Sequence, residues 1–186
     1  LPILPSGGQS AWKNPYQDVT DSSSYYEAVC YVTEKGLMNG TSASTFSPDA
    51  AMTRAMMVTI LWRMEKEPAA LKSNFTDLTA DWYRTAVDWA AETGVVNGVG
   101  NGKFAPNATL SLEQLITILY RYAENKGYNV SKSASLDSFT DGSAVSAYAR
   151  PAMQWAVGMN FLSGNTLTPG APASRAQIAQ VLMLFC

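Results

Sequence analysis

Residues 36–55 read GLMNGTSASTFSPDAAMTRA, and residues 94–113 read GVVNGVGNGKFAPNATLSLE. The two stretches align without a gap, because each has Gly, two apolar residues and Asn-Gly, then Phe-x-Pro, then a hydroxyl residue. A third copy, residues 161–176, reads FLSGNTLTPGAPASRA and keeps the apolar pair, Ser-Gly, Leu-x-Pro and Ser-Arg-Ala. Internal repetition decides the architecture before any local pattern does. The sequence therefore predicts three related units.

Each copy lies between two segments with apolar residues at helical spacing. The first helix of each unit is predicted at residues 24–35, 82–93 and 147–159, and the second at residues 53–66, 111–126 and 174–185. An aromatic-x-Asp sequence opens each unit and ends at Asp18, Asp77 or Asp141. The units are thus residues 16–70, 75–128 and 139–186. Residues 1–15 hold three Pro and two Gly and are predicted to be a linker or tail.

The second helices carry apolar stripes that have no partner within their own unit. Met57 and Leu61 form one stripe, and Leu115 and Leu119 form another. A unit of roughly 60 residues buries too little surface to be stable alone. We therefore expect a single, mostly α-helical domain in which the three second helices form a small central bundle.

Composition excludes several classes of partner. Hydrophobic residues make up 47% of the chain, charged residues 15%, and the net charge is −2. The absence of a Lys/Arg run argues against nucleic acid, which needs a basic face. No apolar stretch is long enough to span a membrane, so we expect no membrane insertion. The start at Leu1 lacks Met and the pattern of a signal peptide, which we interpret as a mature or excised fragment, so it does not argue against secretion.

The residue types also argue against catalysis. The chain has no His, which removes the usual general base and metal ligand. Carboxylates at Asp81, Asp88 and Glu92 fit a loop and a solvated helix face better than a catalytic pair. No calcium loop is present either. From these absences together we expect no enzyme activity, no metal and no cofactor. Cys30 is expected to be a small buried group, and a bridge to Cys186 stays open.

The start of each second helix carries the most informative polar residues. Thr53, Ser111 and Ser174 are good N-caps, and the last two form capping boxes with Gln114 and Gln177. Capping does not explain Arg54 and Arg175, because a cation in the first turn opposes the helix dipole. Each needs a compensating anion. That anion is either an internal carboxylate such as Asp18 or Asp77, or an anionic ligand held with the backbone N–H groups of the helix start.

Taken together, these motifs resemble the S-layer homology (SLH) repeat, over residues 16–186. The resemblance rests on aromatic-x-Asp, an aromatic-rich helix, Gly-(apolar)2-x-Gly, Phe-x-Pro and a Thr-Arg-Ala-like helix start. It implies a three-pronged, pseudo-symmetric spindle with one helix of each repeat in a central bundle. It also implies an extracellular module at the bacterial surface that anchors a fused or adjacent cargo domain. The implied partner is a secondary cell-wall polymer, an anionic polysaccharide that commonly carries a pyruvate-ketal sugar.

The resemblance implies that the ligand lies in grooves between neighbouring repeats. Candidate binding residues are Arg54, Arg175, Gln177, Asp77, Trp82 for sugar stacking, and the pairs Asn39 and Gly40, Asn97 and Gly98, and Ser163 and Gly164. The Gly of each pair is expected to permit a chain reversal at positive φ. Trp89 and Trp155 are expected in the core.

The chain departs from the family pattern at two places. None of the three helix starts ends in the family's Glu, and Leu112 replaces Arg in the second copy, so that groove is expected to be weak or structural. We expect Arg54→Ala and Arg175→Ala to weaken polymer binding while melting stays nearly unchanged. The alternative is a protein–protein or self-assembly module whose grooves no longer bind sugar. The sugar, the cargo and the oligomeric state are not determined by the sequence.

Overall fold

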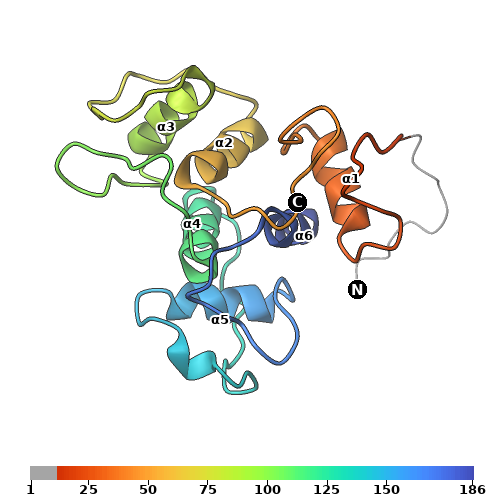
Figure 1. Cartoon of the computed structure of the whole chain (residues 1–186). Coiled ribbons are helices and arrows are strands. Elements are labelled where there is room, and N and C mark those ends of the chain that lie inside the picture. The colour runs from red at the N-terminus through yellow and green to blue at the C-terminus, as the bar shows by residue number, and fades with distance from the viewer. Residues whose placement is uncertain (1–11) are drawn as a thin grey trace.

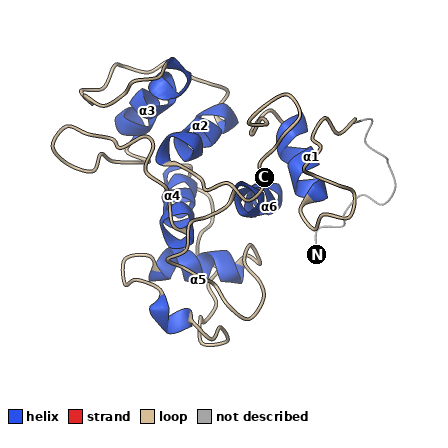
Figure 2. Cartoon of the chain, viewed as in Figure 1, coloured by secondary structure: helices blue, strands red, loops and turns tan. Residues whose placement is uncertain are grey.

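The computed structural model describes residues 12–186. Its helices are α1 (Tyr26–Glu34), α2 (Arg54–Met64), α3 (Asp81–Thr93), α4 (Leu112–Asn125), α5 (Arg150–Gly158) and α6 (Arg175–Phe185), with one 3-10 turn, η1 (Gly142–Ala144). Over these residues, extended pairing is confined to isolated bridges between loop positions (Figure 2). The prediction of a mostly α-helical domain is confirmed.

The starts of the second helices are capped as the sequence predicted. The side chains of Thr53, Ser111 and Ser174 each accept a hydrogen bond from the backbone N–H three residues later. Gln114 and Gln177 bond back to complete two capping boxes, which Met56 cannot do after Thr53. These caps fix where α2, α4 and α6 begin.

Closely packed helix pairs join different repeats. The pairs are α2 with α3, α4 with α5, and α6 with α1, so each second helix packs on the first helix of the following repeat. The third pair closes a ring, because α6 of the last repeat packs on α1 of the first. Figure 1 shows α1, α3 and α5 in three outer lobes, with α2, α4 and α6 lying towards the middle. The repeat in the sequence is therefore not the packing unit in space.

A ring of backbone hydrogen bonds fixes this arrangement just before the second helices. The N–H of Met52 donates to the carbonyl of Ala173 at 2.8 Å. Ala173 donates to Leu110, and Leu110 donates to Met52, each at 2.9 Å. All three residues are buried and immediately precede an N-cap. Because each repeat gives one bond and receives one, removing any repeat leaves two buried backbone groups without partners.

One hydrophobic core runs through all three repeats. The apolar stripes named from the sequence are almost fully buried at Met57, Leu61, Leu115, Leu119 and Leu182. Trp89 and Trp155 also lie in this core, at 7% and 2% exposure, as predicted. The shared core explains why units too small to be stable alone form one domain.

The predicted linker, residues 1–15, falls partly outside the described residues, which begin at Trp12. The Trp12 ring lies 6.4 Å from that of Tyr16 and 5.8 Å from that of Tyr26, measured between centroids. Asn14 accepts a hydrogen bond from the N–H of Tyr16 at 2.9 Å. Residues 12–15 therefore pack against the first repeat.

Candidate functional site

The first N–H groups of each second helix donate hydrogen bonds to carbonyl oxygens of a neighbouring repeat. The N–H groups of Arg54 and Ala55 donate to the carbonyl oxygens of Ala108 and Pro106, both at 3.0 Å. The same bonds recur from Leu112 to Ala171, Glu113 to Pro169, Arg175 to Ala50, and Ala176 to Pro48. The hypothesis that these N–H groups bind an anionic ligand is therefore wrong, because protein carbonyls already accept from them.

Arg175 reaches from the start of α6 into the loop of repeat 1. Its Nε donates to the carbonyl of Phe46 at 2.8 Å, and its Nη2 donates to the carbonyl of Asn39 at 2.5 Å. The guanidinium lies 4.6 Å from the centroid of the Phe46 ring, and the residue is 6% exposed. Burial lowers the pKa of Arg175, and the nearby Tyr16 and Asp18 oppose that shift. Arg175 is thus a clamp between two repeats.

Arg54 makes the equivalent clamp from α2 to repeat 2. Its Nε donates to the carbonyl of Phe104 at 2.9 Å and its Nη2 to that of Asn97 at 2.7 Å. Burial lowers the pKa of Arg54, and the negative charge of Asp77 opposes the shift. Among residues 12–186 neither clamp arginine forms an ion pair, so carbonyl oxygens and a more distant carboxylate balance each charge. The Nη1 of each keeps solvent contact and has no hydrogen-bond partner in this range.

The opening aspartates hold the loops that the arginines clamp. Asp77 accepts from the N–H groups of Phe104 at 2.9 Å and Ala105 at 2.8 Å. Burial works to raise the pKa of Asp77, but these two hydrogen bonds outweigh it and hold the pKa below its ordinary value. Asp18 and Asp141 accept equivalent pairs of bonds in their own repeats. Asp77, a candidate ligand contact, therefore uses both carboxylate oxygens to hold its loop.

These bonds stabilise an unfavourable backbone. Ser47, Ala105 and Thr168 have φ of 57°, 57° and 49°, although each carries a side chain and each precedes Pro. The residue before Pro favours extended backbone, and positive φ is costly without Gly. The aspartate carboxylates offset this cost by accepting the N–H of the strained residue in all three repeats.

Gly40 and Gly98 are required for a different reason from the one predicted. Gly164 has φ of 104°, but neither Gly40 nor Gly98 has a positive φ. A Cβ on Gly40 would lie 2.5 Å from the ring of Tyr16, and one on Gly98 would lie 2.5 Å from the ring of Phe75. Each Gly therefore lets the loop lie against the aromatic residue that opens its repeat. The prediction of positive φ is wrong at these two positions.

Groove A is a cavity of about 360 Å³ between repeats 1 and 2. Its walls are the repeat 1 loop with Asn39 and Gly40, the clamp residue Arg175, and Trp82 at the start of α3. Its floor is one face of α2, formed by Met56, Thr59, Ile60 and Arg63. The fold thus brings together four of the residues that the sequence proposed.

Groove B, about 250 Å³, repeats this construction between repeats 2 and 3. Arg54, Asn97 and Gly98 take the places of Arg175, Asn39 and Gly40, and Tyr148 takes the place of Trp82. The floor is the matching face of α4, formed by Gln114, Thr117, Ile118 and Arg121. Trp82 and Tyr148 are 54% and 55% exposed, so each groove has an aromatic ring open to solvent at its rim.

The third junction has different chemistry. Groove C, a cavity of about 370 Å³ between α6 and α1, is lined by Gln180 and Leu184 of α6 and by Asp21 and Glu27 of repeat 1. Its charged side chains are both acidic. Ser163, Gly164 and Gln177 are not among the residues lining grooves A to C. The Gln177 side chain accepts from the N–H of Ser174 at 2.9 Å, which is the capping role.

Sequence reasoning missed Arg63 and Arg121. The two occupy the same position on α2 and α4, and the third helix has Leu184 there. The sequence carried only part of this signal, because repeat 2 has Arg121 with Leu112 and repeat 3 has Leu184 with Arg175. Two arginines meet in one groove only once neighbouring repeats pack together. Arg121 is exposed and has no hydrogen bond with any of residues 12–186. It is the accessible cation of groove B.

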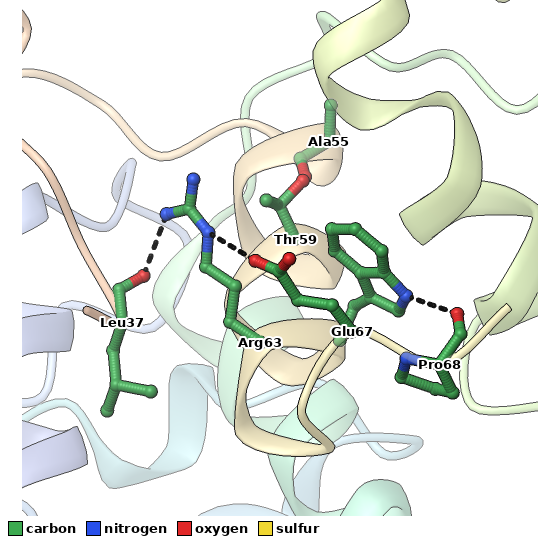
Figure 3. Close-up of polar contacts among 7 residues, drawn as sticks. Leu37, Ala55, Thr59, Arg63, Glu67 and Pro68 are labelled. Atoms are coloured by element: carbon green, nitrogen blue, oxygen red, sulfur yellow. Dashed lines mark hydrogen bonds and ion pairs between the residues drawn. The ribbon is translucent and has the colours of Figure 1, made fainter. Parts of the chain in front are cut away.

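Arg63 is positioned more tightly than Arg121. Its Nη1 donates to the carbonyl of Leu37 at 3.1 Å, and its Nε lies 3.9 Å from a carboxylate oxygen of Glu67 (Figure 3). Figure 3 shows the guanidinium extending from α2 between these two partners. The side chain is 27% exposed, so the cation still faces groove A.

Metal-ligand clusters and disulfide bonds are absent from residues 12–186. Among residues 12–186 no group of three or more His, Cys, Asp and Glu is placed to hold a metal ion. No disulfide joins Cys30 to Cys186 in this range. Over the same range, no helix has both the length and the apolar character needed to cross a membrane.

Comparison with known proteins connects this geometry to a family. The family described as the S-layer homology domain matches residues 15–56, 74–116 and 138–179. The chain belongs to the S-layer homology family. Each match begins at the opening of a repeat and ends within its second helix, so it contains the loop, the aspartate and the helix start described above.

Relatives of the chain include both surface-layer proteins and enzymes. It is 31% identical over 175 residues to an endoglucanase of Bacillus sp. (strain KSM-635), covering 90% of this chain and 18% of that protein. It is 30% identical over 162 residues to the surface-layer 125 kDa protein of Lysinibacillus sphaericus, covering 83% and 13%. A cellulosome-anchoring protein of Acetivibrio thermocellus is 26% identical over 136 residues, covering 68% and 30%.

The S-layer homology chain spans less than a third of each of these relatives. It is a cell-surface module, as the family and the surface-layer relatives indicate.

Proposed function

We propose that this S-layer homology domain anchors a secreted bacterial protein to the cell wall by binding a secondary cell-wall polysaccharide. The anionic substituent of the polymer, a pyruvate ketal on a sugar, lies in groove A or groove B. The observation that carries the proposal is the pairing of Arg175 with Arg63 in one groove and of Arg54 with Arg121 in the other. Groove C has acidic side chains instead.

The two arginines of a groove have separate tasks. Arg175 and Arg54 hold the groove wall by donating to loop carbonyls, and each offers one remaining nitrogen to the ligand. Arg63 and Arg121, at the far end of the floor, supply the second positive charge. A guanidinium binds a carboxylate through a fork of N–H donors, which suits the ketal carboxylate.

The rim of each groove supports binding of the sugar ring. Trp82 and Tyr148 present exposed aromatic faces with an apolar body and a polar edge. The side chains of Asn39 and Asn97 are also exposed and supply amide groups for sugar hydroxyls. Together these groups match a ligand that is both a sugar and an anion.

The names of the relatives support anchoring rather than catalysis. An endoglucanase, a surface-layer protein and a cellulosome-anchoring protein have different functions but share this segment. A segment shared by proteins of such different names is non-catalytic and serves attachment. In this proposal the cargo is a separate domain of the same protein.

Calorimetric titration with a pyruvylated wall disaccharide, beside the same disaccharide stripped of its ketal, tests the proposal. We expect the first to bind with two sites per chain, and its affinity to fall with added salt. The stripped sugar should bind at least about tenfold more weakly, because each groove then loses its charge contacts. If neither sugar binds, the polysaccharide function is wrong. Concentration-dependent self-association in the same samples would then favour the self-assembly alternative.

A further inference from the structure

A further cavity of the described residues adjoins groove A at the C-terminal ends of α2, α4 and α6. We call it the end cavity. It has a volume of about 690 Å³, and the side chains that matter here are Tyr31, Lys35, Arg63, Lys126, Tyr128 and Phe185. Neither the family matches nor the function proposed for grooves A and B assigns this cavity a role.

The end cavity is positively charged. Lys35, Arg63 and Lys126 line it, with Glu65 as the one carboxylate side chain. Glu65 already accepts a hydrogen bond from the Tyr122 hydroxyl at 2.5 Å and pairs with Lys126 at 2.8 Å. Its charge is therefore compensated within the wall, and the exposed Lys35 remains for a ligand. Such a cavity favours an anionic occupant.

Aromatic rings give the same cavity apolar surfaces. The Tyr128 ring lies 6.0 Å from that of Phe185 and 6.4 Å from that of Tyr122, between centroids, and Tyr128 is 49% exposed. Tyr31 adds a fourth ring, with the Lys35 ammonium 5.9 Å from its centroid. Aromatic rings beside cations and hydroxyl groups suit sugar rings that carry negative charge.

Groove A leads to the end cavity. Leu37 and Arg63 line both. The floor of groove A follows α2 to Arg63, and the next two residues, Met64 and Glu65, line the end cavity. The Arg63 guanidinium, bonded to the Leu37 carbonyl, therefore lies at the boundary (Figure 3). Groove B shares no lining residue with the end cavity.

We propose that the end cavity is a second polysaccharide subsite, which binds the inner sugars of the polymer whose terminal anionic sugar lies in groove A. This rests on the proposed function for groove A and adds a direction for the bound chain, along α2 towards its C-terminal end. It predicts that a longer ligand gains affinity in groove A and gains none in groove B.

The test compares the pyruvylated disaccharide with longer oligosaccharides released from the same purified wall polymer. In the unaltered protein we expect the longer ligand to bind about tenfold tighter at one of two sites. The double variant Lys35→Gln/Lys126→Gln should lose most of that gain and bind the disaccharide unchanged, because screened cation contacts are each worth a few-fold. Lys72→Gln/Lys132→Gln removes the same charge from exposed positions elsewhere and should keep the gain.

Tyr128→Leu gives an independent variant, since it keeps an apolar side chain but removes the exposed ring. It should reduce the gain for the longer ligand and leave disaccharide binding unchanged. Melting curves of each variant check that the fold is intact. If the disaccharide binds and the longer ligand gains nothing, or if the gain survives in both variants, the end cavity is not a subsite and the groove proposal stands. If neither ligand binds, both proposals are wrong.

Discussion

Each second helix begins at a junction with the next repeat, and the first residue of the helix is Arg54, Leu112 or Arg175. The two arginine junctions differ from the leucine junction in their side-chain contacts, although the backbone hydrogen bonds are equivalent at all three. At the arginine junctions a guanidinium, buried at Arg175 and partly buried at Arg54, donates to two loop carbonyls of the next repeat. At the third, the side chain of Leu112 is buried, at 4% exposure, and has no hydrogen-bond donor. The ring of backbone bonds is the same at each. The repeated sequence therefore determines the backbone arrangement, and the side chains determine which junctions carry positive charge.

Glu113 takes over the polar contact at the leucine junction. It is 7% exposed and accepts from the N–H of Ser146 at 2.9 Å and from its hydroxyl at 2.7 Å. The equivalent positions in the other repeats are Ala55 and Ala176. The leucine junction thus departs from the repeat pattern at Leu112 and Glu113. It has a buried carboxylate that accepts hydrogen bonds, where the other junctions have a guanidinium that donates them.

Leu112→Ala should give the largest loss of stability. Removing a buried leucine leaves a cavity at the helix start, and we expect the free energy of unfolding to fall by about 2–4 kcal/mol. Denaturant unfolding measures the loss, and Leu71→Ala is the control because Leu71 is 76% exposed. Binding of the disaccharide should not change. A binding loss at Leu112 as large as that at an arginine would contradict the assignment of the grooves.

Arg175→Ala should destabilise the domain by about 2–3 kcal/mol, since it leaves two carbonyl oxygens without donors. This reverses the expectation from sequence that melting would hardly change, because the structure buries the guanidinium. Arg54→Ala should cost less, because Arg54 is only partly buried. Arg175→Lys keeps the charge but loses the fork and should be intermediate. Equal melting temperatures for Arg175→Ala and the unaltered protein would exclude the clamp.

Arg121→Gln should affect binding and leave folding intact. Arg121 is exposed in groove B, so we expect the affinity of that site to fall about tenfold, or about 1.4 kcal/mol, with unchanged melting. Calorimetric titration should then show one strong site in place of two. Arg150→Gln, outside the grooves, is the control. Two unchanged strong sites would mean that Arg121 does not contact the ligand.

Glu113→Gln tests whether the carboxylate of Glu113 stabilises the leucine junction. The amide still offers one oxygen to Ser146 but loses the charge, so we expect a loss of about 1 kcal/mol in unfolding free energy. Glu124→Gln on the exposed face of α4 should have almost no effect. If the two variants are equally stable, Leu112 and the backbone ring hold this junction without Glu113.

The smallest effect is expected at low pH. Hydrogen bonds hold the pKa of Asp77 below its ordinary value, so its stabilising contribution is complete above the unfolded pKa of about 3.9 and is lost as pH falls through the folded pKa. Asp77→Asn should therefore lower the melting temperature slightly at pH 7, and the difference should shrink below about pH 4. A difference that does not depend on pH would mean that the carboxylate charge is not what holds the loop.

The sequence alone was sufficient for everything that depends on spacing along the chain. Three copies of one pattern determined three repeats, and Ser111 and Ser174 with their Gln partners determined where two helices begin. Periodic apolar stripes on the second helices determined a shared core. These features depend on residues a few positions apart, so the chemistry of a short segment decides them.

Only the tertiary structure decided what the arginines do and where the grooves lie. Arg175 meets Asn39, and α6 packs on α1, across nearly the whole length of the chain. No periodic pattern records such contacts, because they depend on how the ring of repeats closes. The same closure brings Arg63 and Arg175 into one groove, and it pairs the N–H groups of the helix starts with carbonyl oxygens of a neighbouring repeat. Local sequence therefore determines the three repeats, whereas grooves A and B exist only because the repeats pack into a closed ring.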